Sequence, residues 1–130
     1  QTAKEVLKKY PEVKGILGTS SFDAPGTARA IDELGLKGKV FTAGTGMPAA
    51  NAQILKDGSV STLTLWDPAN AGYAMASLAT KILNGETIED GVNLGVEGYE
   101  SMHFSSGSTK VLEGTGWLKI TKDNVDSLGF

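Results

Sequence analysis

The chain of 130 residues contains no cysteine, one histidine and one arginine, and each shortage removes a class of function. Without cysteine there is no disulfide, no thiolate nucleophile and no cysteine-based zinc site. His103 alone is too few for a histidine-based metal site, so we expect no metal and no cofactor. A net charge of −3 with Arg29 as the single arginine argues against nucleic acid as a partner, because binding it requires a clustered basic surface.

Long apolar runs and catalytic motifs are also missing. No run approaches the ~18 apolar residues of a transmembrane helix, so we expect no membrane span. The run Gly44–Ala49 lacks the third glycine of a dinucleotide fingerprint, and Gly35–Lys39 lacks the spacing and hydroxyl of a P-loop. No Gly-x-Ser-x-Gly motif occurs. We therefore expect no enzyme; the minor alternative is a small α/β enzyme, for which only Asp23 and Asp67 could supply titratable groups.

Three strand–helix units at similar spacing occupy the first two thirds of the chain, after an opening helix at residues 3–10. The expected strands are residues 13–18, 39–43 and 60–66, and Asp or Pro starts the helix after each. Alternating strands and helices predict an α/β fold with a parallel β-sheet and flanking helices.

The remainder from Glu86 onward is rich in glycine and less regular. Residues 92–96 and 100–104 are strand-like, and residues 121–128 carry a short helical pattern. We expect this part to cross back over the sheet as a tail and not to form a separate domain.

The candidate ligand site lies at the carboxyl ends of the three strands, because open parallel sheets bind ligands at that edge. These ends are turns of small residues that lead into helix N-termini, so their free backbone N–H groups can donate to a ligand. Trp66 adds a flat apolar surface, and hydroxyls come from Thr19, Ser20, Ser21 and Thr45. The set suits a small, neutral, oxygen-rich molecule.

Each candidate also has a purely structural interpretation. Gly44 and Gly46 serve turn geometry as readily as ligand approach. Asp23 and Asp67 are better explained as helix caps than as ligand contacts. Trp66 is as compatible with a core position as with a pocket wall, and His103 is best explained as structural or exposed.

Several motifs together resemble one family. They are Tyr10–Leu17, Glu33–Gly38, Gly72-Tyr73 with Ile82–Glu86, Leu65-Trp66-Asp67-Pro68, and Thr121–Asp126. Over essentially its whole length the chain is similar to the C-terminal part of type I periplasmic (solute) binding proteins. Within them it is most similar to the rhamnose and autoinducer-2 branch of ABC transporter substrate-binding proteins.

The resemblance implies ligand contacts from the main chain at Thr19 and Ser21, and an apolar wall from Leu65 and Trp66. Gly44 and Thr45 stand where many sugar binders of the superfamily carry an aspartate, which moves the interpretation away from ribose or galactose. The full set of expected ligand-binding residues is Thr19, Ser21, Gly44, Thr45, Leu65, Trp66 and Asp67.

The resemblance further implies a substrate-binding component of a bacterial ABC importer for a sugar-like ligand. Such a protein is periplasmic or lipid-anchored outside the cell and works with a membrane permease. We expect its signal sequence to lie outside these 130 residues. The alternative is the effector-sensing core of a transcriptional repressor of the same superfamily, which an upstream helix-turn-helix would identify.

The resemblance also implies a division into two lobes. Residues 1–66 and about 99–130 would belong to the second lobe, and about 68–98 would visit the first. A missing N-terminal lobe would leave a stripe of Met75, Leu78 and Ile82 uncovered. We therefore expect weak or no ligand binding by these residues alone, and self-association through the stripe.

Overall fold

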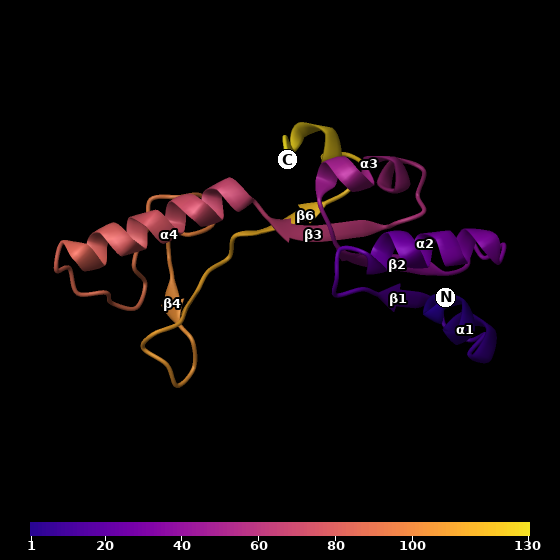
Figure 1. The fold of residues 1–130 in the computed structure, drawn as a ribbon, viewed down its shortest axis with the longest axis horizontal. Helices are drawn as coiled ribbons and strands as arrows, with labels where there is room; N and C mark the ends of the chain where they lie inside the picture. Colours follow the sequence, from indigo (N-terminus) through magenta and orange to yellow (C-terminus); the bar gives the residue numbers. More distant parts are fainter. The chain divides into compact units, whose positions relative to one another are not determined.

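The computed structural model describes all 130 residues, which form two compact units. Unit 1 comprises Gln1–Leu65 and Lys119–Phe130, and unit 2 comprises Trp66–Leu118. Figure 1 labels the elements of both units.

The sheet of unit 1 has the strand order β1-β2-β3-β6. Its strands are β1 (Gly15–Leu17), β2 (Phe41–Thr45), β3 (Thr62–Trp66) and β6 (Trp117–Ile120). The first three strands run parallel to one another. The predicted α/β fold with a parallel sheet is therefore confirmed.

Three helices accompany this sheet: α1 (Thr2–Lys9), α2 (Asp23–Glu33) and α3 (Pro48–Lys56). In Figure 1, α2 and α3 lie on the same side of the strands. The core forms there, with Ile31, Leu55 and Leu63 at most 2% exposed. The opposite face of the sheet carries exposed side chains, among them Leu17 and Phe41.

The strands begin later than their apolar runs predict, because local turns hold the first residues. The N–H of Val13 donates to the carbonyl of Tyr10, and that of Val40 donates to the carbonyl of Leu36. The N–H of Val60 likewise donates to Ile54 in the last turn of α3. These backbone groups close turns and are not available to a β-ladder.

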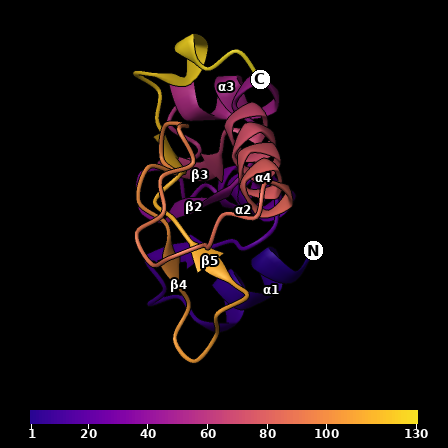
Figure 2. The same cartoon turned by 90° about the vertical axis from the view of Figure 1, so that its left-hand side faces the viewer.

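Unit 2 is built on α4 (Pro68–Leu83), the longest helix. The two-stranded antiparallel pair β4 (His103–Phe104) and β5 (Leu112–Glu113) belongs to the same unit (Figure 2). Residues 92–96 form no regular strand and contribute a single bridge, between Val92 and Met102.

We expected the part from Glu86 onward to cross back over the sheet as a tail without forming a unit of its own, and this expectation is wrong. Ala74 of α4 packs with Leu94 and Met102 in a core that belongs to unit 2 itself. The chain returns to unit 1 at Lys119. The lobe boundaries expected near residues 68 and 99 stay a prediction. The correspondence of these units to the two lobes of a binding protein stays a prediction.

The last twelve residues return to unit 1 through β6, a strand that the sequence analysis did not predict. The predicted helix at 121–128 is only a 3₁₀ turn, η1 (Val125–Ser127). Ile120 and Val125 are nevertheless buried, at 0% and 2% exposed. This segment therefore completes the core of unit 1.

None of the helices combines the length and the apolar character that crossing a bilayer requires.

Candidate functional site

The carboxyl ends of β1 and β2 lie against each other in unit 1. The N–H of Gly18, directly after β1, donates to the carbonyl of Ala43 in β2 at 2.9 Å. The loop with Thr19 and Ser21 therefore begins beside the end of β2, where Gly44 and Thr45 lie. The structure brings these four predicted ligand-binding residues to one edge of the sheet.

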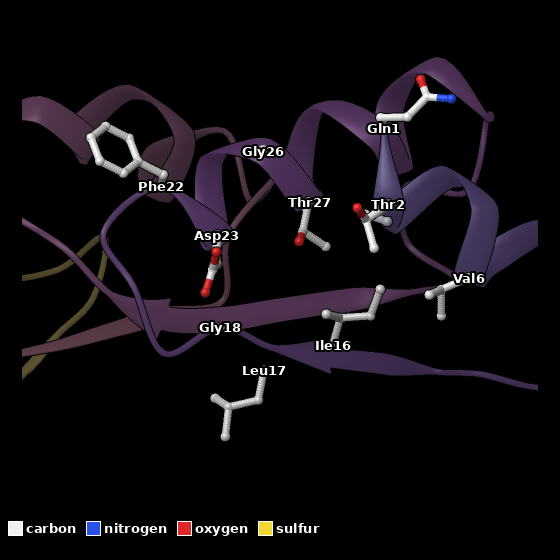
Figure 3. Close-up of a pocket in the computed structure, with 11 residues that line it drawn as sticks. Gln1, Thr2, Val6, Ile16, Leu17, Gly18, Phe22, Asp23, Gly26 and Thr27 are labelled. Carbon is white, nitrogen blue, oxygen red and sulfur yellow. The ribbon is translucent and has the colours of Figure 1, made fainter.

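Asp23 closes the loop after β1 and does not cap the helix that follows (Figure 3). Its Oδ2 accepts hydrogen bonds from the N–H groups of Thr19 at 3.0 Å and Ser20 at 2.9 Å. The N-cap position of α2 is Phe22. The cap interpretation of Asp23 is therefore wrong, and the Thr19 N–H that we expected to be free for a ligand is already bonded. The side chains of Thr19 and Ser21 are exposed.

Gly44 lies at a close contact between β2 and its neighbours. A Cβ at this position would lie 3.1 Å from the carbonyl oxygen of Gly18 and 3.3 Å from Cβ of Ala24. Gly44 is buried under α2, so its small size serves the approach of the helix to the sheet. This contact supplies a structural reason for the glycine that needs no ligand.

Thr45 lies at the very end of β2, opposite Thr64 of β3. Its hydroxyl donates to the carbonyl of Thr64 at 2.7 Å, which fixes the side chain. A hydroxyl that donates to the protein keeps lone pairs that can accept a bond from a ligand hydroxyl. Thr45 is half-buried, so those lone pairs lie near solvent.

Leu65 is only 9% exposed and belongs to the buried side chains of unit 1. It lies on the helix-covered face of the sheet because its neighbours in β3, Thr64 and Trp66, point to the other face. Its expected place in an apolar pocket wall stays a prediction.

Unit 2 contributes a pair of aromatic residues, of which Trp66 was predicted from the sequence and Trp117 was not. The rings of Trp66 and Trp117 meet edge to face, with centroids 5.4 Å apart and planes at 83°. Both remain accessible, at 44% and 60% exposed, so Trp66 is not a core residue. The chain has two tryptophans, and the rarity of this residue type is the feature of the sequence that could have pointed to Trp117.

Asp67 is the N-cap of α4, as its position before Pro68 predicted. Its Oδ1 accepts from the N–H groups of Ala69 at 2.7 Å and Asn70 at 3.2 Å. These bonds satisfy two of the helix-start donors that have no partner inside the helix.

Ser101, His103 and Asp90 form a hydrogen-bonded row in unit 2. Oγ of Ser101 lies 3.2 Å from Nε2 of His103, and Nδ1 of His103 lies 2.9 Å from Oδ2 of Asp90. Asp90 also accepts from the N–H of Phe104 at 2.7 Å. The bond from His103, followed by that from Phe104, lowers the pKa of Asp90 below its ordinary value.

This row is a surface feature and not a catalytic triad. The side chains of His103 and Asp90 are 61% and 58% exposed. Such relays work in sites that exclude water, where preorganised donors stabilise the developing charge. The row instead ties β4 to the loop that contains Asp90, which agrees with the structural and exposed interpretation of His103. No group of three or more His, Asp or Glu side chains is arranged to hold a metal ion.

With this geometry in view, comparison with known proteins identifies the family. The family model described as a periplasmic binding protein domain matches residues 1–87. The chain belongs to this family. Members of this family bind solutes and are not enzymes, so the expectation that the chain is not an enzyme is confirmed.

Solved structures show the same fold. A sugar ABC transporter protein from Actinomyces odontolyticus matches with a TM-score of 0.79 and 28% identity, over 100% of this chain and 41% of its own. LsrB from Clostridium saccharobutylicum in complex with AI-2 matches with 0.68 and 21%, over 98% and 43%. A solute-binding protein from Clostridium phytofermentas with bound L-rhamnose matches with 0.69 and 20%, over 98% and 43%. The chain thus spans about two fifths of the length of these proteins.

Proposed function

We propose that this chain is part of the substrate-binding component of a bacterial ABC importer for a small, neutral, sugar-like ligand such as rhamnose, autoinducer-2 or a related polyol. The protein would act in the periplasm, or anchored by lipid outside the cell. It would deliver the ligand to a membrane permease.

The observation that carries this proposal is the match of residues 1–87 to the periplasmic binding protein family. Structures with the same fold include proteins named for sugar transport and proteins with bound AI-2 or L-rhamnose. These ligands differ in detail and share a small size and several oxygen atoms. The proposal is therefore drawn at the level of that chemistry.

The residues at the strand ends of unit 1 suit such a ligand. We assign contacts to Thr19, Ser21, Gly44 and Thr45. Hydroxyl side chains both donate and accept, which matches the hydroxyl groups of a sugar. None of these four residues carries a charge, so a neutral ligand would meet no unpaired charge on them.

Aromatic surface in unit 2 supports the same class of ligand. The exposed face of an indole packs on the C–H face of a sugar ring, and Trp117 holds the Trp66 ring through an edge-to-face contact. We assign Trp66 a direct contact, with Leu65 and Asp67 as its neighbours in sequence.

The test is calorimetric titration of the protein encoded by the complete gene with L-rhamnose, autoinducer-2, L-arabinose and D-allose. We expect at least one of them to bind, and Trp66→Ala to weaken that binding by about tenfold or more, which is about 1.4 kcal/mol. The matched control is Trp117→Phe. It retains an aromatic ring against Trp66 and should change the affinity less.

Two results would contradict these assignments. If Trp66→Ala binds as tightly as the unchanged protein, Trp66 is no part of the ligand site. If none of the four compounds binds and a charged solute does, the proposed class of ligand is wrong.

A further inference from the structure

The C-terminal end of α4 carries the one asparagine of the chain that a glycine follows. Asn84 is the C-cap residue of the helix, and Gly85 comes next with a φ of 78°, in the left-handed region. Both residues are exposed. The side-chain amide of Asn84 therefore lies at the surface of unit 2, beside a main-chain nitrogen that no Cβ shields.

An asparagine followed by glycine supports a reaction that proceeds without a catalyst. The main-chain nitrogen of Gly85 attacks the side-chain carbonyl carbon, Cγ, of Asn84. The new N–Cγ bond replaces the bond from Cγ to the amide nitrogen, which leaves as ammonia with the proton of the Gly85 N–H. Water then opens the resulting succinimide ring, and gives aspartate by attack at Cγ or isoaspartate by attack at the main-chain carbonyl. Glycine favours the first step because it has no Cβ to hinder ring closure.

The folded end of α4 restrains this attack. The ψ of Asn84 is 0°, which turns the Gly85 nitrogen away from Cγ. The N–H of Gly85 donates to the carbonyl of Ile82, and that of Glu86 donates to the carbonyl of Lys81, both at 3.0 Å. This pair of bonds is a Schellman motif. An ion pair from Nζ of Lys81 to Oε2 of Glu86, 3.1 Å long, spans the same residues.

Other pairs in the chain are less suited to the reaction. Aspartate precedes glycine twice, at Asp57 and Asp90, but a carboxylate resists attack because it is already negatively charged. Both carboxylates are also held, Asp57 by the N–H of Ser59 and Asp90 by that of Phe104. The remaining asparagines precede residues whose Cβ hinders ring closure; they are Asn51, Asn70, Asn93 and Asn124.

We propose that Asn84 is a site of spontaneous deamidation in this protein, and that opening of the last turn of α4 sets its rate. Helix ends open more readily than helix interiors. When opening and closing are fast, the observed rate is the chemical rate multiplied by the open fraction. The product places a negative charge at the C-terminal end of a helix, where the helix dipole opposes it. The proposal does not depend on which solute the protein binds.

The test incubates the protein encoded by the complete gene at mildly alkaline pH, in water enriched in heavy oxygen. Peptide mapping by mass spectrometry then locates each converted asparagine and separates aspartate from isoaspartate. Heavy oxygen enters only when water opens the ring, so the label excludes material that was converted before the incubation. The same protein unfolded in urea gives the rate without the helix.

Two variants at one position separate the contacts that hold the helix end. Glu86→Pro removes the N–H that bonds to Lys81, together with the ion pair. Glu86→Gln keeps that N–H and removes only the charge, so it is the matched control.

We expect Asn84 to convert before any other asparagine, and at least ~10-fold faster in urea than in the folded protein. Glu86→Pro should raise the rate in the folded protein by about tenfold or more, because the lost hydrogen bond increases the open fraction. Glu86→Gln should raise it by at most about fivefold, since an exposed ion pair contributes little.

Three results would overturn the proposal. One is an Asn84 that stays unlabelled while another asparagine is converted. Another is an equal rate in the folded and the unfolded protein, which would remove the control by the helix end. The third is a Glu86→Pro protein that deamidates no faster than Glu86→Gln.

Discussion

At position 44 the polypeptide leaves little room for a side chain. Gly44 lies where β2 passes under α2, and its nearest neighbours are the carbonyl oxygen of Gly18 and the methyl group of Ala24. A backbone atom at 3.1 Å cannot rotate away as a flexible side chain can. The approach of α2 to the sheet therefore depends on this residue.

Two glycine-to-alanine changes in unit 1 should shift stability in opposite directions. Gly44→Ala should lower the free energy of unfolding by about 1–3 kcal/mol, because the added methyl overpacks the core. Gly26→Ala should raise it by about 0.5–1 kcal/mol, because Gly26 lies within α2 and a Cβ there meets nothing within 4 Å. Urea denaturation measures both values. A Gly44→Ala variant as stable as the original would show that the helix can move aside.

For single residues, the sequence identified which side chains form local hydrogen bonds better than it identified their partners. Asp23 and Asp67 both precede or begin a helix, and capping was expected for both. Asp67 caps α4, whereas Asp23 turns back to the N–H groups of Thr19 and Ser20. The local sequence fails to separate these outcomes because the choice depends on the path of the preceding loop.

Among the elements, the helices were more predictable than the strands. Asp and Pro at the starts, and Gly35 and Gly58 in left-handed conformations past the ends, mark α2, α3 and α4 within the sequence. The strands depend on partners distant in sequence. β6 is four residues long, and nothing in the residues around Gly116 shows that it pairs beside β3.

The β4–β5 hairpin should respond to acid through Asp90. The bonds from His103 and from the N–H of Phe104 favour the charged carboxylate and lower its pKa from the ordinary 3.8. A lowered pKa gives stability that is present above the ordinary value and lost as the pH falls through the folded one. The Phe104 amide shift in NMR should therefore titrate with a midpoint below 3.8.

Asp90→Asn is the matched variant for this titration, since it keeps the shape of the side chain and removes its charge. Its Phe104 amide should not titrate in this range. An unchanged titration in the variant would assign the response to another carboxylate.

For the whole molecule, the exposed side of α4 offers a site for self-association. Met75, Ile82 and Leu83 are 71%, 56% and 86% exposed. Leu78, which we expected in the same stripe, packs instead against the core of Ala74, Leu94 and Met102. The face is narrower than predicted and still apolar, and such surfaces commonly mark contact sites.

We expect the 130-residue chain to form dimers or larger species whose fraction increases with concentration, and Met75→Lys with Ile82→Lys to reduce that fraction. Thr80→Lys, a change at another exposed position of the same helix, is the control for added charge. Sedimentation velocity measures the distribution. A chain that stays monomeric at all concentrations, or a control as effective as the double variant, would refute this role of the stripe.

The return of residues 119–130 to unit 1 also determines when that unit can fold. Ile120 and Val125 belong to its core, the hydroxyl of Thr62 donates to the carbonyl of Ile120, and Lys56 pairs with Asp126. All of unit 2 lies between these partners in the chain. During synthesis, unit 1 therefore stays incomplete until residues 119–130 have left the ribosome, and its folding includes the closure of one long loop.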